Sequence, residues 1–200
     1  DRLARHASIF RKYLTQGSLQ KGLVSQIVIG RITLRRLNLK EVKKAIPEII
    51  KNLEDEDLLI KLWAQDTINS LVEAGVEKNR LSVALPYTIK NINFSQDDII
   101  SEITHIALET VLAMLRGGYS FEDSNDILND AVERVRTIIL SEETSETTRE
   151  LALKVLAAFI ERGMVDEEGF FNFMDDVLRP YHYSVTLNHD FVVGFYAVLA

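Results

Sequence analysis

Histidines and closely spaced carboxylates are the side chains of this 200-residue sequence whose types could support chemistry. His182 and His189 lie seven residues apart, with Asp190 beside the second, and these are ligand types that bind Zn²⁺. Their spacing does not match a motif such as H-E-x-x-H, so we expect loop histidines held by hydrogen bonds. The sequence therefore predicts no metal site and no cofactor.

His105 is flanked by carboxylates at helical spacing. Glu102 and Glu109 stand three residues before and four residues after it, so a helix brings all three side chains to one face. We expect an exposed polar cluster there. The remaining acidic pairs fall in segments expected to be turns and helix starts, where the helix dipole favours carboxylates, or on a polar helix face. The sequence has no cysteine, no nucleophile elbow and no Gly-rich phosphate loop, and we predict that the protein is not an enzyme.

These residues lie within a repeated pattern. Residues 45–53 and 84–92 read AIPEIIKNL and ALPYTIKNI, which agree at seven of nine positions when Ile and Leu are treated as equivalent. Ile60 and Ala64 recur 43 residues later as Ile103 and Ala107. Periods of about 40 to 47 residues indicate a helical solenoid, in which stacked helix pairs bury a continuous core.

The unit at 45–75 predicts two amphipathic helices, because its apolar residues recur at three- and four-residue spacings. We expect Asp57 to cap the second helix, Pro47 to lie near the start of the first, and Gly75 to follow the end of the second. The stretch 23–34 contains several β-branched residues, which favour a strand. Its spacing of small and apolar residues repeats that of the unit, so we predict a buried helix.

Three segments of the second unit and one of the fourth resemble the HEAT-repeat pattern L-P…L-x-D…V-R-x-x-A. They are Ile46-Pro47, Leu53-x-Asp55, Ile60-Lys61-x-x-Ala64 and Thr148-Arg149-x-x-Ala152. The resemblance implies an all-α fold, a right-handed α-solenoid of about five stacked antiparallel helix pairs of HEAT or armadillo type. We expect one domain over residues 1–200, with units at 1–40, 41–78, 79–120, 121–165 and 166–200. Since such repeats mostly bind other macromolecules, the resemblance also implies a non-enzymatic protein-binding scaffold, part of a larger assembly or of a longer repeat protein.

The second helices of HEAT repeats line the concave face of the solenoid. The resemblance therefore places a set of polar and charged residues on that face, where we expect a protein partner with basic or polar side chains. These residues are Lys61, Gln65, Asn69, Glu102, His105, Glu109, Arg149 and Lys154. Trp63 is expected to pack between units, because the equivalent positions in the later units are apolar.

The charge of the chain is unevenly distributed. Residues 1–44 hold eleven Lys and Arg against two Asp and Glu, a balance of +9, whereas residues 45–200 have a balance of −16. A basic end favours an anionic partner such as nucleic acid, an acidic protein or the acidic part of a second copy, and the alternative is a solvated terminal face. The candidate anionic-partner patch consists of Arg5, Arg11, Lys12, Arg31, Arg35 and Arg36.

Three further expectations concern class and location. A HEAT-like DNA glycosylase or lyase is the enzyme alternative, but the acidic middle of the chain argues against the basic groove that such an enzyme needs. The segment 190–200 is apolar almost all round, so we expect that the chain continues beyond it, that a partner or a second copy covers it, or that the preceding loop folds back over it. We expect an intracellular protein without a membrane span, because the sequence has no cysteine, signal peptide or long apolar run.

Overall fold

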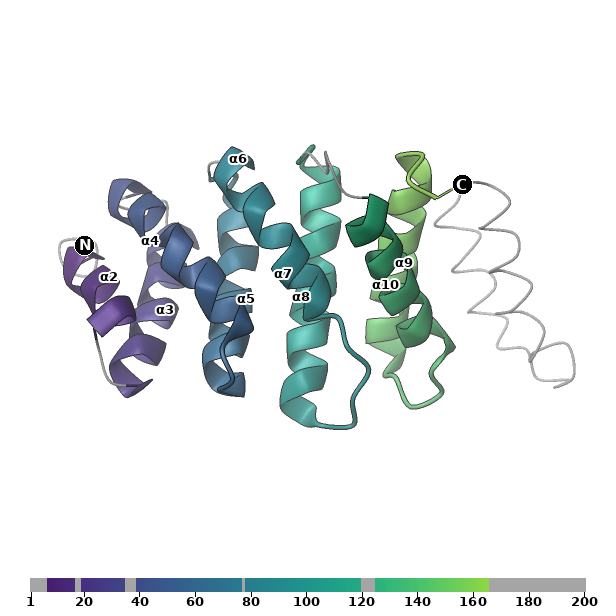
Figure 1. Ribbon diagram of the computed structural model, residues 1–200, viewed down its shortest axis with the longest axis horizontal. Helices are drawn as coiled ribbons and strands as arrows, with labels where there is room; N and C mark the ends of the chain where they lie inside the picture. The colour runs from purple at the N-terminus through teal and green to yellow at the C-terminus, as the bar shows by residue number, and fades with distance from the viewer. Residues whose placement is uncertain (1–6, 17–18, 35–38, 77, 120–124, 166–200) are drawn as a thin grey trace, which may run out of the picture.

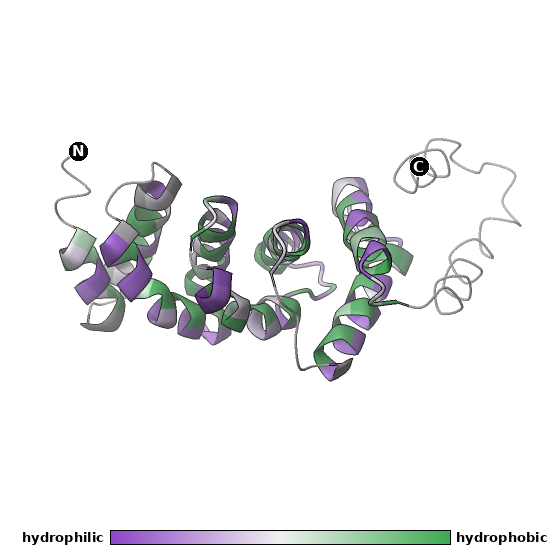
Figure 2. Ribbon diagram, turned by 90° about the horizontal axis from the view of Figure 1, so that it is seen from above, coloured by the Kyte–Doolittle hydropathy of each residue, from purple (hydrophilic) through white to green (hydrophobic). Residues whose placement is uncertain are grey.

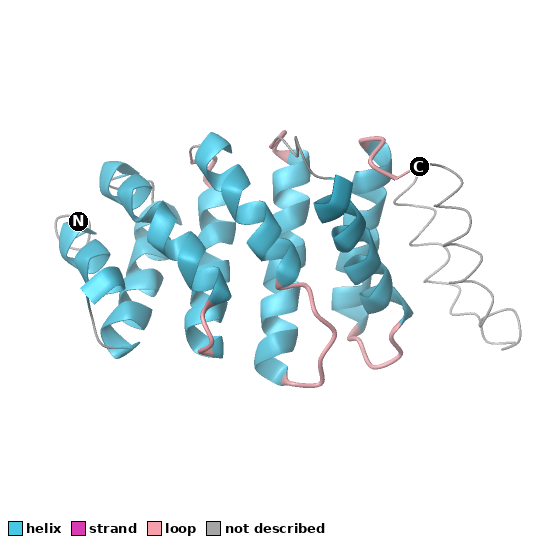
Figure 3. Cartoon of the chain, viewed as in Figure 1, coloured by secondary structure: helices cyan, strands magenta, loops and turns pink. Residues whose placement is uncertain are grey.

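The computed structural model describes residues 7–16, 19–34, 39–76, 78–119 and 125–165. Every regular element in these ranges is a helix, and no strand occurs among them (Figure 3). The α-helices are α2 (Ala7–Gln16), α3 (Leu19–Leu34), α4 (Leu39–Lys51), α5 (Leu58–Glu73), α6 (Lys78–Leu81), α7 (Leu85–Lys90), α8 (Asp98–Arg116), α9 (Asn125–Leu140) and α10 (Glu146–Glu161). Two 3₁₀ turns, η1 (Asn52–Glu54) and η2 (Ser82–Ala84), join them. The expected fifth unit at 166–200, with His182 and His189, lies outside the described residues.

The helices stack side by side along the length of the molecule (Figure 1). Seen from above, α2, α4, α7 and α9 form one row, the first-helix row, and α3, α5, α8 and α10 form the second-helix row (Figure 2). In the second-helix row, α5 packs against both α3 and α8, and α8 packs against α10. The β-branched stretch 23–34 lies within α3, so the helix predicted there is confirmed. This arrangement is the all-α solenoid that the repeat predicts.

The core is continuous between the two rows. Ala64, Ala107 and Ala152 have no exposed surface, and they occupy equivalent positions of α5, α8 and α10. A small side chain at this position lets the backbones of neighbouring helices approach closely, and larger residues such as Ile68 and Phe159 fill the space around it. Because each unit contacts only its neighbours, no single helix pair buries its apolar stripe alone.

Local sequence signals set the starts and ends of the second helices. The carboxylate of Asp57 accepts hydrogen bonds from the backbone N–H groups of Leu59 and Ile60, at 2.9 and 3.3 Å, as its predicted capping role requires. Gly75, as predicted, follows the end of α5 and has a φ of 66°, a left-handed conformation that costs glycine little. Asp97 caps α8 in the same way as Asp57 caps α5.

Pro47 is the exception to these signals. The prediction that it lies near the start of a helix is wrong, because α4 begins at Leu39 and Pro47 stands well inside it. Proline has no N–H to donate to the carbonyl four residues earlier, which weakens a helix at that point. Pro47 itself is exposed, so it lies on the side of α4 that faces solvent.

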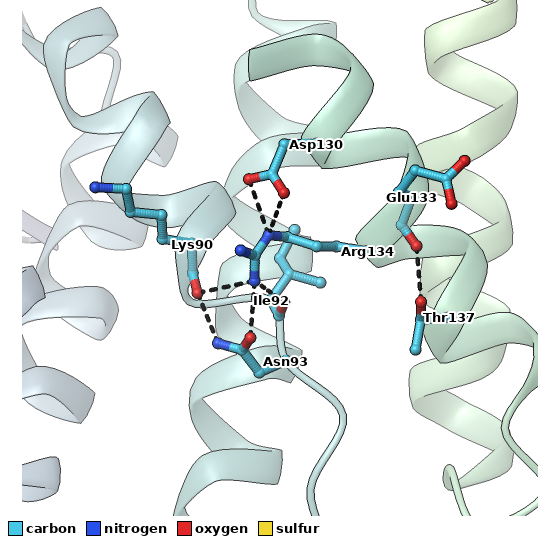
Figure 4. A network of polar contacts seen from close by, with 7 residues as sticks. All are labelled: Lys90, Ile92, Asn93, Asp130, Glu133, Arg134 and Thr137. Atoms are coloured by element: carbon cyan, nitrogen blue, oxygen red, sulfur yellow. Dashed lines mark hydrogen bonds and ion pairs between the residues drawn. The ribbon is translucent and has the colours of Figure 1, made fainter. Parts of the chain in front are cut away.

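Arg134 of α9 joins the fourth unit to the third (Figure 4). Its Nε donates to both carboxylate oxygens of Asp130 at 2.9 Å. Its Nη1 donates to Asn93 Oδ1 at 2.7 Å and to the carbonyl of Ile92 at 3.2 Å, just after α7 ends. Asn93 in turn donates from Nδ2 to the carbonyl of Lys90. One guanidinium therefore satisfies the end of α7 and fixes α9 beside it.

We expect Arg134→Ala to lower the free energy of unfolding by about 1–2 kcal/mol, because it leaves Asp130 unpaired and removes three hydrogen bonds, to Lys90, Ile92 and Asn93, at the end of α7. Urea denaturation followed by circular dichroism measures the change. Lys51→Ala is the control, since the Lys51 side chain is 78% exposed and lies 4.0 Å from Glu48. Equal unfolding midpoints for the two variants would contradict this role of Arg134.

Candidate functional site

We call the side of the second-helix row that faces away from the first-helix row its outer side. It brings together four residues that the sequence placed on one face. Glu102 and Glu109 of α8 are exposed there, and Asn69 of α5 and His105 of α8 are partly exposed. Asn69 Nδ2 donates to Glu109 Oε2 at 3.5 Å, and His105 Nε2 lies 3.8 Å from Glu109 Oε1. On its other side, His105 Nδ1 lies 3.2 Å from the hydroxyl of Thr148 in α10. The contacts therefore link three neighbouring helices.

Gln65 does not lie on this surface, and its prediction as an outward residue is wrong. Its side chain is fully buried between α5 and the third unit. Gln65 Nε2 donates to Thr110 Oγ1 at 3.1 Å, and Gln65 Oε1 accepts from Asn91 Nδ2 at 3.2 Å. Asn91 Nδ2 also donates to the carbonyl of Leu53 at 3.3 Å. The buried Gln65 amide therefore bonds to polar groups of the third unit, and its role is to hold the two units together.

The remaining predicted residues of the face have internal contacts or intermediate exposure. Arg149 is half-buried, and its Nη2 donates to the carbonyls of Ser141 and Thr144 at 2.6 and 3.3 Å, so it holds the turn before α10. Lys154 lies 2.6 Å from Glu150, its neighbour one helical turn earlier. Lys61 is partly exposed.

Asp66 is the central residue of the face that the sequence reasoning missed. It lies on α5 one helical turn after Leu62, on the side where Asn69 is partly exposed and Glu73 is exposed. Burial raises the pKa of the Asp66 carboxyl, nearby Arg31 on α3 lowers it, and Glu102 on α8 raises it further. Asp66 therefore extends the acidic group of α8 onto α5. We call Asp66, Glu102 and Glu109 the acidic cluster.

The predicted anionic-partner patch is divided between the two rows. Arg11 and Lys12 lie on α2 in the first-helix row, and Arg31 lies on α3 in the second-helix row. Arg11 Nε lies 3.2 Å from Glu41 Oε2. The pKa of Glu41 is lowered, mainly by its hydrogen bond from Lys44 and also by Arg11. Three further members of the patch are outside the described residues: Arg5, Arg35 and Arg36.

Metal-binding clusters and membrane-spanning helices are both absent from the part of the chain that the structure describes. No group of three or more His, Asp or Glu side chains there could hold a metal ion. None of the helices described is long and apolar enough to cross a membrane.

Comparison with solved structures identifies the fold. A designed armadillo repeat protein, YIII(Dq)4CqI, superposes with a TM-score of 0.63 at 16% identity, covering 99% of this chain and 89% of the designed one. A second designed armadillo repeat protein, YIII(Dq.V1)4CPAF in complex with the peptide (KR)4, gives a TM-score of 0.63 at 15% identity, covering 96% and 80%. No protein-family model and no curated protein matches the sequence. The chain has an armadillo/HEAT-like helical repeat fold.

We expect Asp66→Asn to stabilise the protein at pH 7. The pKa of Asp66 is higher in the folded state than in the unfolded state. The wild type therefore loses stability as pH rises through the folded pKa, whereas the Asp66→Asn variant, which has no carboxyl group at this position, does not. The difference should vanish near pH about 3, where both states of the wild type hold the proton. Thermal unfolding at the two pH values measures this, with the exposed Glu142→Gln as control. If the wild type is at least as stable as Asp66→Asn at pH 7, the ionised Asp66 carboxylate does not destabilise the fold and this prediction is wrong.

Proposed function

We propose that this chain is a non-enzymatic scaffold that binds another protein through the outer side of its second-helix row, within a larger assembly or a longer repeat protein. The bound segment carries Lys or Arg side chains. The observation that carries the proposal is the acidic cluster, in which Asp66, Glu102 and Glu109 stand on adjacent helices of one face.

The electrostatics of the cluster favour a cationic partner. Burial and Glu102 both make the ionised form of Asp66 unfavourable, so a Lys or Arg placed beside it relieves a cost that the free protein carries. Arg31 lies on the α3 side of Asp66 and Lys154 on the α10 side of the cluster, where it contacts Glu150. The negative charge that would attract a cationic partner is therefore concentrated on α5 and α8.

A structural neighbour supports this choice of partner. One of the two designed armadillo proteins of similar fold was solved with the peptide (KR)4, which consists of alternating Lys and Arg. A similar mode of binding is consistent with the negative charge that α5 and α8 expose here. The fold supplies the row of helices, and the acidic cluster supplies the charge.

The surroundings of His105 favour binding over catalysis. The hydroxyl beside its ring belongs to Thr148, whose side chain is buried and accepts a hydrogen bond from the Ser145 hydroxyl at 2.9 Å. A nucleophile needs access to a substrate carbonyl or phosphate, which this hydroxyl lacks. The alternative of nucleic-acid binding depends on the basic first unit, where Arg11 is paired with Glu41. A phosphate backbone would also meet repulsion at the acidic cluster.

Binding of fluorescein-labelled (KR)4 tests the proposal. We expect fluorescence anisotropy in about 50 mM salt to show saturable binding, because screening of exposed charges is weak there. Glu102→Lys with Glu109→Lys should weaken binding by about tenfold or more, since two attractive contacts become repulsive.

The matched control is Glu142→Lys with Glu143→Lys, which makes the same change of net charge on the exposed turn between α9 and α10. We expect this control to bind (KR)4 much as the wild type does. An equal loss in both double variants would show that net charge alone attracts the peptide, and the proposed face would be rejected. Absence of binding to the wild type would reject it as well.

A further inference from the structure

Large apolar side chains lie exposed on the same side of the second-helix row, near the middle of α3 and in the first half of α5. Val24 of α3 is 50% exposed and Leu59 of α5 is 46% exposed. Ile27 on α3, and Leu62 and Trp63 on α5, are partly exposed. We call these five residues the apolar patch. Exposed apolar groups that cluster on one face mark interaction sites more often than scattered ones do.

Hydrogen bonds hold α3 beside α5 next to the residues of the patch. Gln26 Nε2 donates to the carbonyl of Ile60 at 3.4 Å, and Thr67 Oγ1 donates to the carbonyl of Gln26 at 3.3 Å. These bonds place the middle of α3 beside α5 from Ile60 to Thr67. Val24 and Ile27 flank Gln26 in the sequence, as Leu59 and Leu62 flank Ile60. The two sets of side chains therefore lie at the same level along neighbouring helices.

The apolar patch borders the acidic cluster. Leu59, Leu62 and Asp66 follow one another at intervals of about one helical turn, and Leu62 and Asp66 are both partly exposed. Glu102 of α8 acts electrostatically on Asp66 from the other side. Apolar and acidic side chains therefore share one surface that extends from α3 to α8.

We infer that the apolar patch and the acidic cluster form one docking surface for a segment of another protein in which apolar side chains adjoin Lys or Arg. The inference rests on the proposed function and specifies its partner more closely. A purely basic segment would leave Val24 and Leu59 in water. A purely apolar partner would bury the acidic cluster with only Arg31 nearby as a counter-charge, which is costly. A segment with both kinds of side chain satisfies both parts of the surface.

Two peptides of equal length and charge test the inference: fluorescein-labelled (Lys-Leu)4 and (Lys-Ser)4. We expect the wild type to bind (Lys-Leu)4 about tenfold more tightly, because its leucines bury against the apolar patch. This preference should disappear in Leu59→Ser with Leu62→Ser. It should persist in Val83→Ser with Leu140→Ser, since those two residues are 59% and 42% exposed and lie outside the second-helix row.

Circular dichroism establishes that each variant is folded, and Leu59→Ser alone replaces the double variant if the latter unfolds. Equal affinities of the wild type for the two peptides would overturn the inference, as would a preference that survives in the Leu59 variant. If (KR)4 binds but (Lys-Leu)4 has no advantage, the inference fails and the proposed function stands. If no peptide binds, both fail.

A second copy of the chain is the competing occupant of the apolar patch. Sedimentation velocity of the wild type and of Leu59→Ser with Leu62→Ser separates the two cases. We expect both to sediment as monomers. A wild-type dimer that the substitutions dissociate would assign the patch to self-association and overturn the inference.

Discussion

Close packing of each second helix against the next is the constraint on which the rest of the structure depends. Ala64, Ala107 and Ala152 let the backbones of adjacent units approach, and the buried bond between Gln65 and Thr110 fixes how α5 is turned relative to α8. Once that rotation is set, the residues left on the outer side are determined. Surface chemistry in this fold is therefore a consequence of how the core packs.

This constraint explains how far the sequence could predict the structure. The all-α solenoid and the caps Asp57 and Gly75 were predictable, because they depend on local residues and on a sequence pattern that recurs in several units. Gln65 was misplaced because glutamine is usually exposed, whereas here its amide is buried in hydrogen bonds between two units. The repeat itself held the better signal. The positions of the second unit that are equivalent to Glu109 and His105, 43 residues earlier, are Asp66 and Leu62.

Charge asymmetry along the sequence was a poorer guide than position in the fold. The basic first unit divides between two rows, and Arg11 is engaged by Glu41 of α4. The acidic residues instead meet on α5 and α8, where burial raises the pKa of Asp66 and we expect its ionised form to cost stability. Costs of this kind are typical of surfaces selected for binding, because a partner of opposite charge relieves them. The apolar side chains beside Asp66 strengthen this interpretation of the face.

The central claim is that the outer side of the second-helix row is the binding surface. Backbone amide chemical shifts of ¹⁵N-labelled protein, recorded during titration with (KR)4, test this claim most directly. The account predicts that the largest changes fall on α5 and α8 around Asp66, Glu102 and Glu109, with little change in α2 and α4. Changes concentrated in the first-helix row, or in the acidic turn at 141–145, would contradict it.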